Sequence, residues 1–445
     1  MTDQARTATG LAQPQQPAAE RARWWQAAMG SDRVALGAHI GSLALGAILI
    51  LWLDRHMWFL YDEWAFFAII HPAAERGDWV HFLFAPYLNH WVTIPNLTWE
   101  AVYHVAGARL YSLYLVPVVA AHLSVVAMVR VILRRAGVGA WAATLLSLII
   151  LLPGPGVGLV TFGWQIEFLG SMAFGLAQLL ISDHDGPPDW RDALGVVCGL
   201  LGLMCSGVAL ALVALVGINL GLRGRWRAAV LAVAPLAAVY VVWYVAIGHA
   251  GAPHQTPAQL ALLPQFVWAG VAATLDGMLA LKGVAGVILL AAIYLLVRSR
   301  VDLRAPGLSL VGAMAAAGVL FFAITGLGRV QGGVDYATQS RYLYVGTVLL
   351  MPLLGVLVCR FVLTPRLMPV VAGALIWITV ANVGAMYASI HQESLHAMDL
   401  RQYVQRLAAS PDLDAADPRQ AVTLWGATYV TFGLVRQLRD QGQLP

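Results

Sequence analysis

The sequence has little charge and few cysteines. Only 11% of its 445 residues are charged, whereas 60% are hydrophobic. A water-soluble protein of this length could not bury so much apolar surface in a core, so the composition excludes that class and indicates a polytopic membrane protein. The three cysteines, Cys198, Cys205 and Cys359, have no metal-ligand spacing. We therefore expect neither a disulfide nor a metal–thiolate site.

Signatures of nucleotide and nucleic-acid binding are also absent from the sequence. There is no Walker loop, and the predicted inner loops are too short for a domain that binds nucleotide sugars. The basic residues lie in small clusters between apolar runs, and Lys282 is the only lysine among them. This distribution is typical of membrane orientation and predicts no nucleic-acid partner. We expect no cofactor; two neighbouring carboxylates could hold a divalent cation, but too few further oxygen ligands are assignable.

Apolar runs predict about eleven transmembrane helices and therefore an all-α fold. The region 193–222 is divided into two short helices at 205–207, because one long helix would place the arginines of 223–227 on the wrong side of the membrane. The predicted spans are 34–53, 110–133, 141–152, 166–181, two within 193–222, 228–247, 271–297, 306–325, 342–362 and 368–387.

The positive residues between the spans orient the chain with its amino terminus inside. This orientation gives a disordered cytoplasmic tail at 1–33, a membrane domain at 34–387 and a small extracytoplasmic helical tail at 388–445. The membrane domain carries a large outer loop at 54–109. Arginine, alanine and glycine usage suggests a GC-rich bacterium, so we expect a multi-pass protein of a bacterial cytoplasmic membrane with its active face outside.

The outer loop is rich in aromatic residues, which suit helices that lie in the membrane interface and cover a cavity. Asp62 and Glu63 stand there in the segment DEWAF at 62–66. Asp62 is either the N-cap of a helix that ends before Pro72 or a general base that accepts a proton from an attacking hydroxyl. Adjacent helical residues point about 100° apart, so Glu63 is expected to position the acceptor or to adjust the electric field at Asp62.

This loop and its motif resemble the GT-C class of integral-membrane glycosyltransferases, and most of all the branch of protein O-mannosyltransferases and bacterial lipid-A or arabinose transferases. The resemblance implies a polyprenyl-phosphate sugar donor and inversion at the anomeric carbon. The sugar would be a hexose or a pentose, and the acceptor a cell-envelope glycan, a glycolipid or a protein. The resemblance also implies that Asp62 is the catalytic base.

Farther along the loop, the segment 88–97 is similar to an Asn-Glu-His-aromatic-x-x-x-Pro stretch of related bacterial membrane proteins. The glutamate is missing here, because His90 follows Asn89 directly. We expect Asn89, His90 and Trp91 to bind sugar hydroxyls or phosphate. The alternative is a structural role at the membrane interface.

Two arginines near the last outer loop are expected to bind the phosphate of the donor. Arg341 and Tyr342 open a predicted span, and arginine offers a bidentate donor to an anion at this depth. The Arg-Tyr pair also resembles a pattern at a late span of GT-C proteins. Arg329 is the substitute ligand. The alternative is that Arg341 only anchors its span at the interface.

Trp164, Gln165 and Glu167 stand at the outer end of another span and are expected to stack on a sugar and bind its hydroxyls. The alternative is the ordinary aromatic belt beside an interfacial carboxylate.

Two other functions remain open. In a transporter or lipid flippase, Asp62 and Glu63 would form a gate or a proton-coupling site; in a scaffold protein they would have no chemical role. Transport sites lie near the middle of the bilayer, whereas most ionisable residues here lie at span ends. The pattern therefore favours a membrane glycosyltransferase.

Overall fold

The computed structural model of the chain describes residues 31–444 except 251–254, 299–301, 363–365 and 428. Residues 1–30 of the expected amino-terminal tail lie outside the described residues. The described part contains eight helical segments long and apolar enough to cross a membrane, together with three shorter apolar helices, Ala140–Leu151, Ala209–Leu222 and Ala285–Tyr294. The expected all-α polytopic membrane fold is confirmed.

In chain order the helices and strands are α2 (Asp32–Leu53), α3 (His71–Glu75), α4 (Trp79–Phe84), β1 (Pro86–Tyr87), β2 (His90–Trp91), α5 (Thr93–Ala106), α6 (Ser112–Arg135), α7 (Ala140–Leu151), α8 (Gly158–Thr161), α9 (Ile166–Ser182), α10 (Trp190–Leu203), α11 (Ala209–Leu222), α12 (Trp226–Trp243), α13 (Pro257–Leu260), α14 (Leu263–Leu279), α15 (Ala285–Arg298), α16 (Pro306–Arg329), α17 (Ser340–Leu357), α18 (Met368–Ala409), α19 (Asp412–Ala415) and α20 (Phe432–Asp440).

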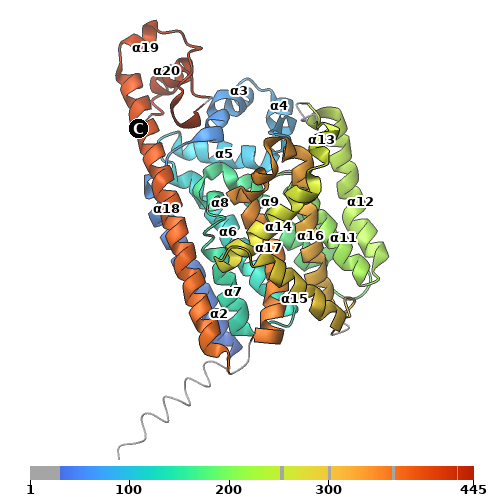
Figure 1. The fold of residues 1–445 in the computed structure, drawn as a ribbon. Helices are drawn as coiled ribbons and strands as arrows, with labels where there is room; N and C mark the ends of the chain where they lie inside the picture. The colour runs from blue at the N-terminus through green and yellow to red at the C-terminus, as the bar shows by residue number, and fades with distance from the viewer. Residues whose placement is uncertain (1–30, 251–254, 299–301, 363–365, 428, 445) are drawn as a thin grey trace, which may run out of the picture.

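Helices α9 and α17 lie in the centre of the bundle (Figure 1). About two thirds of the most apolar part of each is buried inside the protein, 67% for α9 and 61% for α17, whereas the peripheral α12 and α18 bury only 17%. Polar residues at the amino termini of α9 and α17 are therefore surrounded by protein and not by lipid.

The predicted break within 193–222 is confirmed, because α10 ends at Leu203 and α11 begins at Ala209. The carbonyl oxygens freed by the break find donors nearby. The Ser171 hydroxyl donates to the carbonyls of Gly202 and Ser206 at 2.9 and 3.2 Å. A helix can end inside a membrane domain only where such partners exist.

The stretch 271–297, predicted as a short or interrupted span and counted once, is interrupted: the chain turns between α14 and α15. Ala280 and Gly283 adopt left-handed backbone conformations, with φ of 52° and 82°. The Asp276 carboxylate accepts the N–H groups of Gly283 and Ala285 at 2.7 and 3.0 Å and so caps α15. Lys282 lies in this turn and not inside a span.

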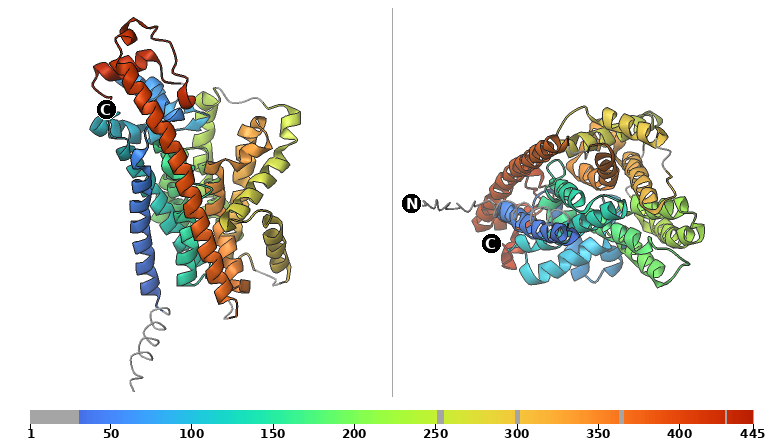
Figure 2. Two further views of the ribbon diagram at one scale, coloured as in Figure 1. Left: turned by 60° about the vertical axis from the view of Figure 1, so that its left-hand side comes forward. Right: turned by 90° about the horizontal axis from the view of Figure 1, so that it is seen from below.

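Helix α18 has 42 residues and runs without a break across the expected boundary between membrane domain and tail at 387/388. Figure 2 shows it along the whole length of the bundle and beyond, toward α19 and α20. Beyond residue 387 its buried side chains follow one face of the helix: Ile390, Ser394, Ala397, Leu400 and Val404. The tail is therefore a direct extension of the last span.

In the outer loop, aromatic residues after α2 pack against one another in edge-to-face contacts. The ring of Phe59 lies 4.9 to 5.2 Å from those of Phe67, Tyr111 and Tyr114, and Trp58 lies 5.1 Å from Trp64. All six are buried. Such aromatic clusters favour a defined geometry, so the loop that carries Asp62 and Glu63 has a rigid base.

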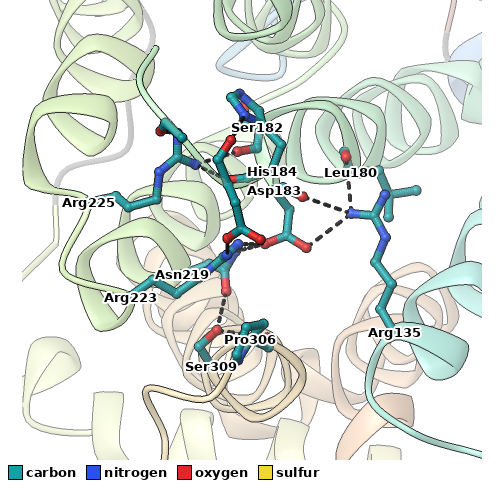
Figure 3. A network of polar contacts seen from close by, with 12 residues as sticks. Arg135, Leu180, Ser182, Asp183, His184, Asn219, Arg223, Arg225, Pro306 and Ser309 are labelled. Carbon is teal, nitrogen blue, oxygen red and sulfur yellow. Dashed lines mark hydrogen bonds and ion pairs between the residues drawn. The ribbon is translucent and has the colours of Figure 1, made fainter. Parts of the chain in front are cut away.

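A cluster of charged and polar residues, here called the Asp183 cluster, lies at the carboxyl end of α9 and joins four helices (Figure 3). Both Asp183 oxygens have partners: Oδ1 accepts from Arg223 at 2.5 Å and Asn219 at 3.1 Å, and Oδ2 from Arg135 at 3.0 Å. The Asn219 amide oxygen accepts from the Ser309 hydroxyl at 2.9 Å. The cluster therefore ties the ends of α6, α9, α11 and α16 together.

Candidate active site

A cavity of about 560 Å³ lies where the first outer loop meets the amino termini of α9 and α17 and the middle of α18. Its walls come from residues widely separated in sequence. They are Leu60, Tyr61, Asp62, Glu63, Gly158, Thr161, Phe162, Trp164, Gln165, Glu167, Gln339, Ser340, Arg341, Ser389 and Glu393. Six residues expected from the sequence, Asp62, Glu63, Trp164, Gln165, Glu167 and Arg341, therefore share one cavity.

Asp62 offers a free carboxylate to this cavity. It lies in a 3₁₀ turn, Tyr61–Glu63, and is half-buried. Within the described part of the chain, no hydrogen bond or ion pair is made to its side-chain oxygens. Burial raises the pKa of Asp62, and the positive charges of Arg341 and Arg329 oppose this rise. Such a carboxylate can accept a proton from a bound molecule.

Glu63, in contrast, is fully engaged with the protein. It is 2% exposed. Its Oε2 accepts the Leu60 N–H at 2.9 Å, and its Oε1 accepts the Tyr111 hydroxyl at 2.8 Å and the Trp164 N–H at 3.3 Å. Burial raises the pKa of Glu63 to about 7, and these hydrogen bonds oppose the rise. The interpretation of Asp62 as a helix cap is wrong, because the Glu63 side chain caps this turn.

Arg341 stands in the first turn of α17, where free backbone N–H groups already favour an anion. Its guanidinium group donates to the Tyr336 hydroxyl at 3.3 Å and lies over the Tyr342 ring, 5.4 Å from the centroid. Its Nε atom is buried and has no partner within the described residues. The group is held in place and keeps a donor for a ligand.

The start of α9 supplies further unpartnered polar atoms. Glu167 is 4% exposed, and its Oε2 has no hydrogen-bond partner among the described residues; the same holds for Gln165 Oε1 and Trp164 Nε1. Leaving a buried polar atom unpaired costs about 1–3 kcal/mol. Several such atoms around one cavity indicate a place for a polar, hydroxylated molecule.

A second, smaller cavity of about 140 Å³ contains four of the five other expected site residues. Asn89, His90, Arg329 and Tyr342 line it, together with apolar side chains. Leu88 and Asn89 form the two-residue turn of the β1–β2 hairpin, with φ of 47° and 70° as a type I′ turn requires. Arg329 donates to the Leu88 carbonyl at 3.0 Å, which fixes the hairpin beside α16.

His90 is a neutral hydrogen-bond donor in this second cavity. Its Nδ1 accepts the Gly207 N–H at 3.2 Å, so the proton of the neutral ring is on Nε2. Burial, with Arg329 and Arg341 nearby, lowers the pKa of His90 to about 3. It is therefore uncharged at physiological pH.

The two cavities are neighbours, because adjacent residues face one or the other. Arg341 lines the first and Tyr342 the second; Glu167 lines the first and Phe168 the second. Trp91 lines neither. Its ring stacks on Trp243 at 5.3 Å, and its indole N–H donates to the Thr93 hydroxyl at 2.7 Å.

Nine of the fifteen cavity residues were not singled out from the sequence, and three of them bear on the chemistry of the site. Glu393 and Ser389 come from α18, and Tyr61 precedes Asp62. The Tyr61 hydroxyl donates to Glu393 Oε2 at 3.0 Å. The sequence shows Glu393 only as one glutamate of the predicted helical tail, and its contact partner Tyr61 lies 332 residues away in sequence.

One group of metal-ligating residue types lies elsewhere. Among the described residues, His184, Asp189 and Asp192 place three ligand-type atoms within 4.8 Å of one another. They follow the carboxyl end of α9, whereas Glu167 stands at its amino end. This group does not belong to the cavity that contains Asp62.

Comparison with known proteins gives a structural relative and no sequence relative. No protein-family model matches the chain, and no curated protein is detectably similar to it. Among solved structures, the crystal structure of ArnT from Cupriavidus metallidurans in the apo state matches with a TM-score of 0.56 and 15% identity, over 92% of this chain and 89% of that one. The chain therefore has an ArnT-like polytopic membrane fold.

Proposed function

We propose that this protein is a GT-C membrane glycosyltransferase that transfers a hexose or pentose from a polyprenyl-phosphate donor to an extracytoplasmic acceptor. The acceptor would be a glycan, a glycolipid or a protein. The protein would lie in the bacterial cytoplasmic membrane. The observation that carries the proposal is the free carboxylate of Asp62 in the same cavity as Arg341. The fold similarity to ArnT and the resemblance of DEWAF to the GT-C pattern support it.

In the proposed reaction, an acceptor hydroxyl attacks the anomeric carbon of the donor sugar. The new bond forms between the acceptor oxygen and this carbon, the bond between the carbon and the phosphate oxygen breaks, and the proton passes to Asp62. Attack opposite the leaving group inverts the anomeric centre. Arg341 and the amino terminus of α17 stabilise the negative charge on the departing lipid phosphate.

The other residues bind and position the substrates in this proposal. Trp164, Gln165 and Glu167 contact the sugar. Arg329 and Tyr342, in the adjoining cavity, hold the lipid-phosphate side of the donor. Glu63 acts on Asp62 indirectly, because its three hydrogen bonds fix the turn that carries Asp62.

The test is transfer by the purified protein in lipid nanodiscs. Radiolabelled polyprenyl-phosphate hexoses and pentoses are supplied with hydroxylated acceptors, and the products are separated from the donor. Asp62→Asn is compared with Asp399→Asn, a change of an exposed carboxylate on α18. We expect transfer by the wild type and by Asp399→Asn, and almost none by Asp62→Asn. Undiminished transfer by Asp62→Asn removes Asp62 as the base, and no turnover of any donor contradicts the proposed function.

A further inference from the structure

The carboxyl-terminal half of α18 forms one wall of the cavity that contains Asp62. Ser389 and Glu393 stand in this wall. The side chain of Glu393 is 24% exposed, so part of its carboxylate remains accessible. Figure 1 shows α18 passing the first outer loop on its way to α19 and α20. The tail is thus in direct contact with the proposed reaction site.

Contacts on both sides of Asp62 connect its turn to the tail. On one side, the Tyr61 hydroxyl donates to Glu393 Oε2 at 3.0 Å. On the other, the Tyr87 hydroxyl donates to the Asp62 carbonyl oxygen at 3.3 Å, and Tyr429 of the tail lies near Tyr87. The backbone that presents the Asp62 carboxylate is therefore held between two contacts with α18 and the segment after it.

The Tyr61 backbone needs such support. Its φ of 51° lies in the left-handed region, which is unfavourable for a bulky residue. Its ring packs edge-to-face on Phe162 at 5.8 Å. Burial and the neighbouring Glu393 raise the pKa of Tyr61 to about 12, so its hydroxyl stays protonated and remains a donor. The bond to Glu393 thus stabilises a strained residue directly before the proposed base.

Two residues of the tail, His396 and Trp425, help to position the Glu393 side chain. His396 Nδ1 lies 3.5 Å from Glu393 Oε2. The His396 ring in turn stacks on Trp425, with ring centroids 3.9 Å apart and planes 19° from parallel. Glu393 is therefore held by residues on either side, and its position depends on the segment that carries Trp425.

Side chains of both charge signs line the cavity. Arg341 lies with Tyr336 and Tyr342 at the start of α17, which suits the phosphate of a donor. The α18 wall, which is bonded to Tyr61 directly before Asp62, carries another of the cavity's carboxylates, Glu393, and the Ser389 hydroxyl. A neutral hydroxyl can donate a hydrogen bond to either carboxylate, whereas an anionic group there would be repelled by both.

We propose that Glu393 positions the acceptor and determines its charge specificity: the site takes a neutral hydroxylated acceptor, bound between Asp62 and Glu393, and rejects one with a phosphate or carboxylate beside the reacting hydroxyl. The segment 388–445 is then a functional part of the active site. This inference rests on the proposed glycosyltransferase function.

Kinetics with two matched acceptors test the inference. The probes are a neutral alkyl glycoside and the same glycoside carrying a phosphate monoester, each with the donor that the wild type uses. The variants are Glu393→Gln and Tyr61→Phe, with Asp399→Asn as the control on the same helix. We expect the wild type to prefer the neutral glycoside at least 10-fold in kcat/KM. Glu393→Gln should raise the KM for this acceptor about 10-fold, leave the donor KM unchanged and reduce the preference to about 2-fold.

A second measurement needs no turnover. Hydrogen–deuterium exchange of the backbone amides at 60–64 should become faster in Glu393→Ala and in Tyr61→Phe, with no further increase in the double variant, because both changes remove the bond between the Tyr61 hydroxyl and the Glu393 carboxylate. Asp399→Asn should leave exchange at 60–64 unchanged. Unchanged exchange in both single variants contradicts the positioning role.

The outcomes separate this inference from the proposed function. Turnover with an unaltered acceptor KM in Glu393→Gln, or a wild-type preference for the phosphorylated acceptor, overturns the role of Glu393 and leaves the glycosyltransferase function standing. An equal loss of kcat with both acceptors, together with a lower Tm, shows a merely structural contribution and also overturns it. Absence of turnover with every donor removes the proposed function, and the acceptor role with it.

Discussion

Helix α9 carries a polar cluster at each end, and the two clusters differ in how their polar atoms are paired. At the carboxyl end, both Asp183 oxygens and the Asn219 amide group have protein partners. At the amino end, the Asp62 carboxylate and the Oε2 atom of Glu167 have none among the described residues. A membrane protein can stabilise buried charge by pairing it, so unpaired polar atoms around a cavity indicate a place for a ligand.

Asp62→Asn removes the unpaired carboxylate and should cause the largest loss of transfer. The amide cannot take the proton of the attacking hydroxyl, and a general base is worth about 10²–10⁴ in rate, so transfer should fall about 1,000-fold. Because no described group donates to this carboxylate, the Tm measured by a thermal scan in detergent should stay near the wild-type value. A large drop in Tm would show that Asp62, like Asp183, mainly stabilises the fold.

Asp183→Asn should have the opposite signature. The change leaves the buried Arg223 guanidinium with a weaker partner and should cost about 3 kcal/mol of stability, seen as a lower Tm. Transfer per folded molecule should remain near normal. Asp185→Asn is the matched control, because Asp185 also pairs with Arg223 but its side chain is 91% exposed. An exposed pair is worth about 0–1 kcal/mol, so an equal Tm loss in both variants would contradict the interpretation.

Arg341→Ala should raise the donor KM about 10- to 100-fold, since a charged hydrogen bond to a phosphate contributes roughly 1.5–3 kcal/mol. It should also shift the pH dependence of transfer. Arg341 lowers the pKa of Asp62, so its removal raises that pKa. The acid limb of the pH–rate profile should therefore move to higher pH. Arg341→Lys keeps the charge and should keep the limb in place; an identical shift in both variants would exclude a charge effect.

Glu63→Gln should have the smallest effect on transfer. It compares the paired Glu63 carboxylate with the unpaired Asp62 carboxylate beside it. A glutamine must turn its NH₂ group toward a backbone N–H or the Tyr111 hydroxyl, which should cost about 1–3 kcal/mol in stability. The rate of transfer should fall only about 10-fold, because the turn that carries Asp62 becomes less ordered. A loss as large as that of Asp62→Asn without a change in Tm would show that Glu63 itself takes part in the reaction.

Much of the site could be predicted because a membrane restricts where charge is stable. Ionisable residues gather at span ends, so Asp62, Glu167 and Arg341 were expected at one surface, and the structure brings them into one cavity. Their assignment to particular cavities was not predictable. Neighbouring helical residues point about 100° apart, so Arg341 faces the first cavity and Tyr342 faces the second.

The unexpected features depend on distant contacts or on single backbone conformations. Glu393 lines the cavity and bonds to Tyr61, which is 332 residues away in sequence, and the Trp91 ring stacks on Trp243 outside both cavities. The break between α14 and α15 follows from a left-handed Ala280, a conformation for which alanine gives no compositional signal. A single sequence does not encode such pairings in any local pattern.

The unbroken length of α18 sets the depth of the reaction site. Glu393 is 25 residues beyond Met368, and at about 1.5 Å per residue it lies roughly 38 Å along the helix. The hydrocarbon layer of a bilayer is about 30 Å thick. If α18 begins at the inner edge of this layer and crosses it upright, the proposed site would lie in the outer headgroup layer, where a lipid-linked molecule and a water-soluble molecule could meet without either leaving its own medium.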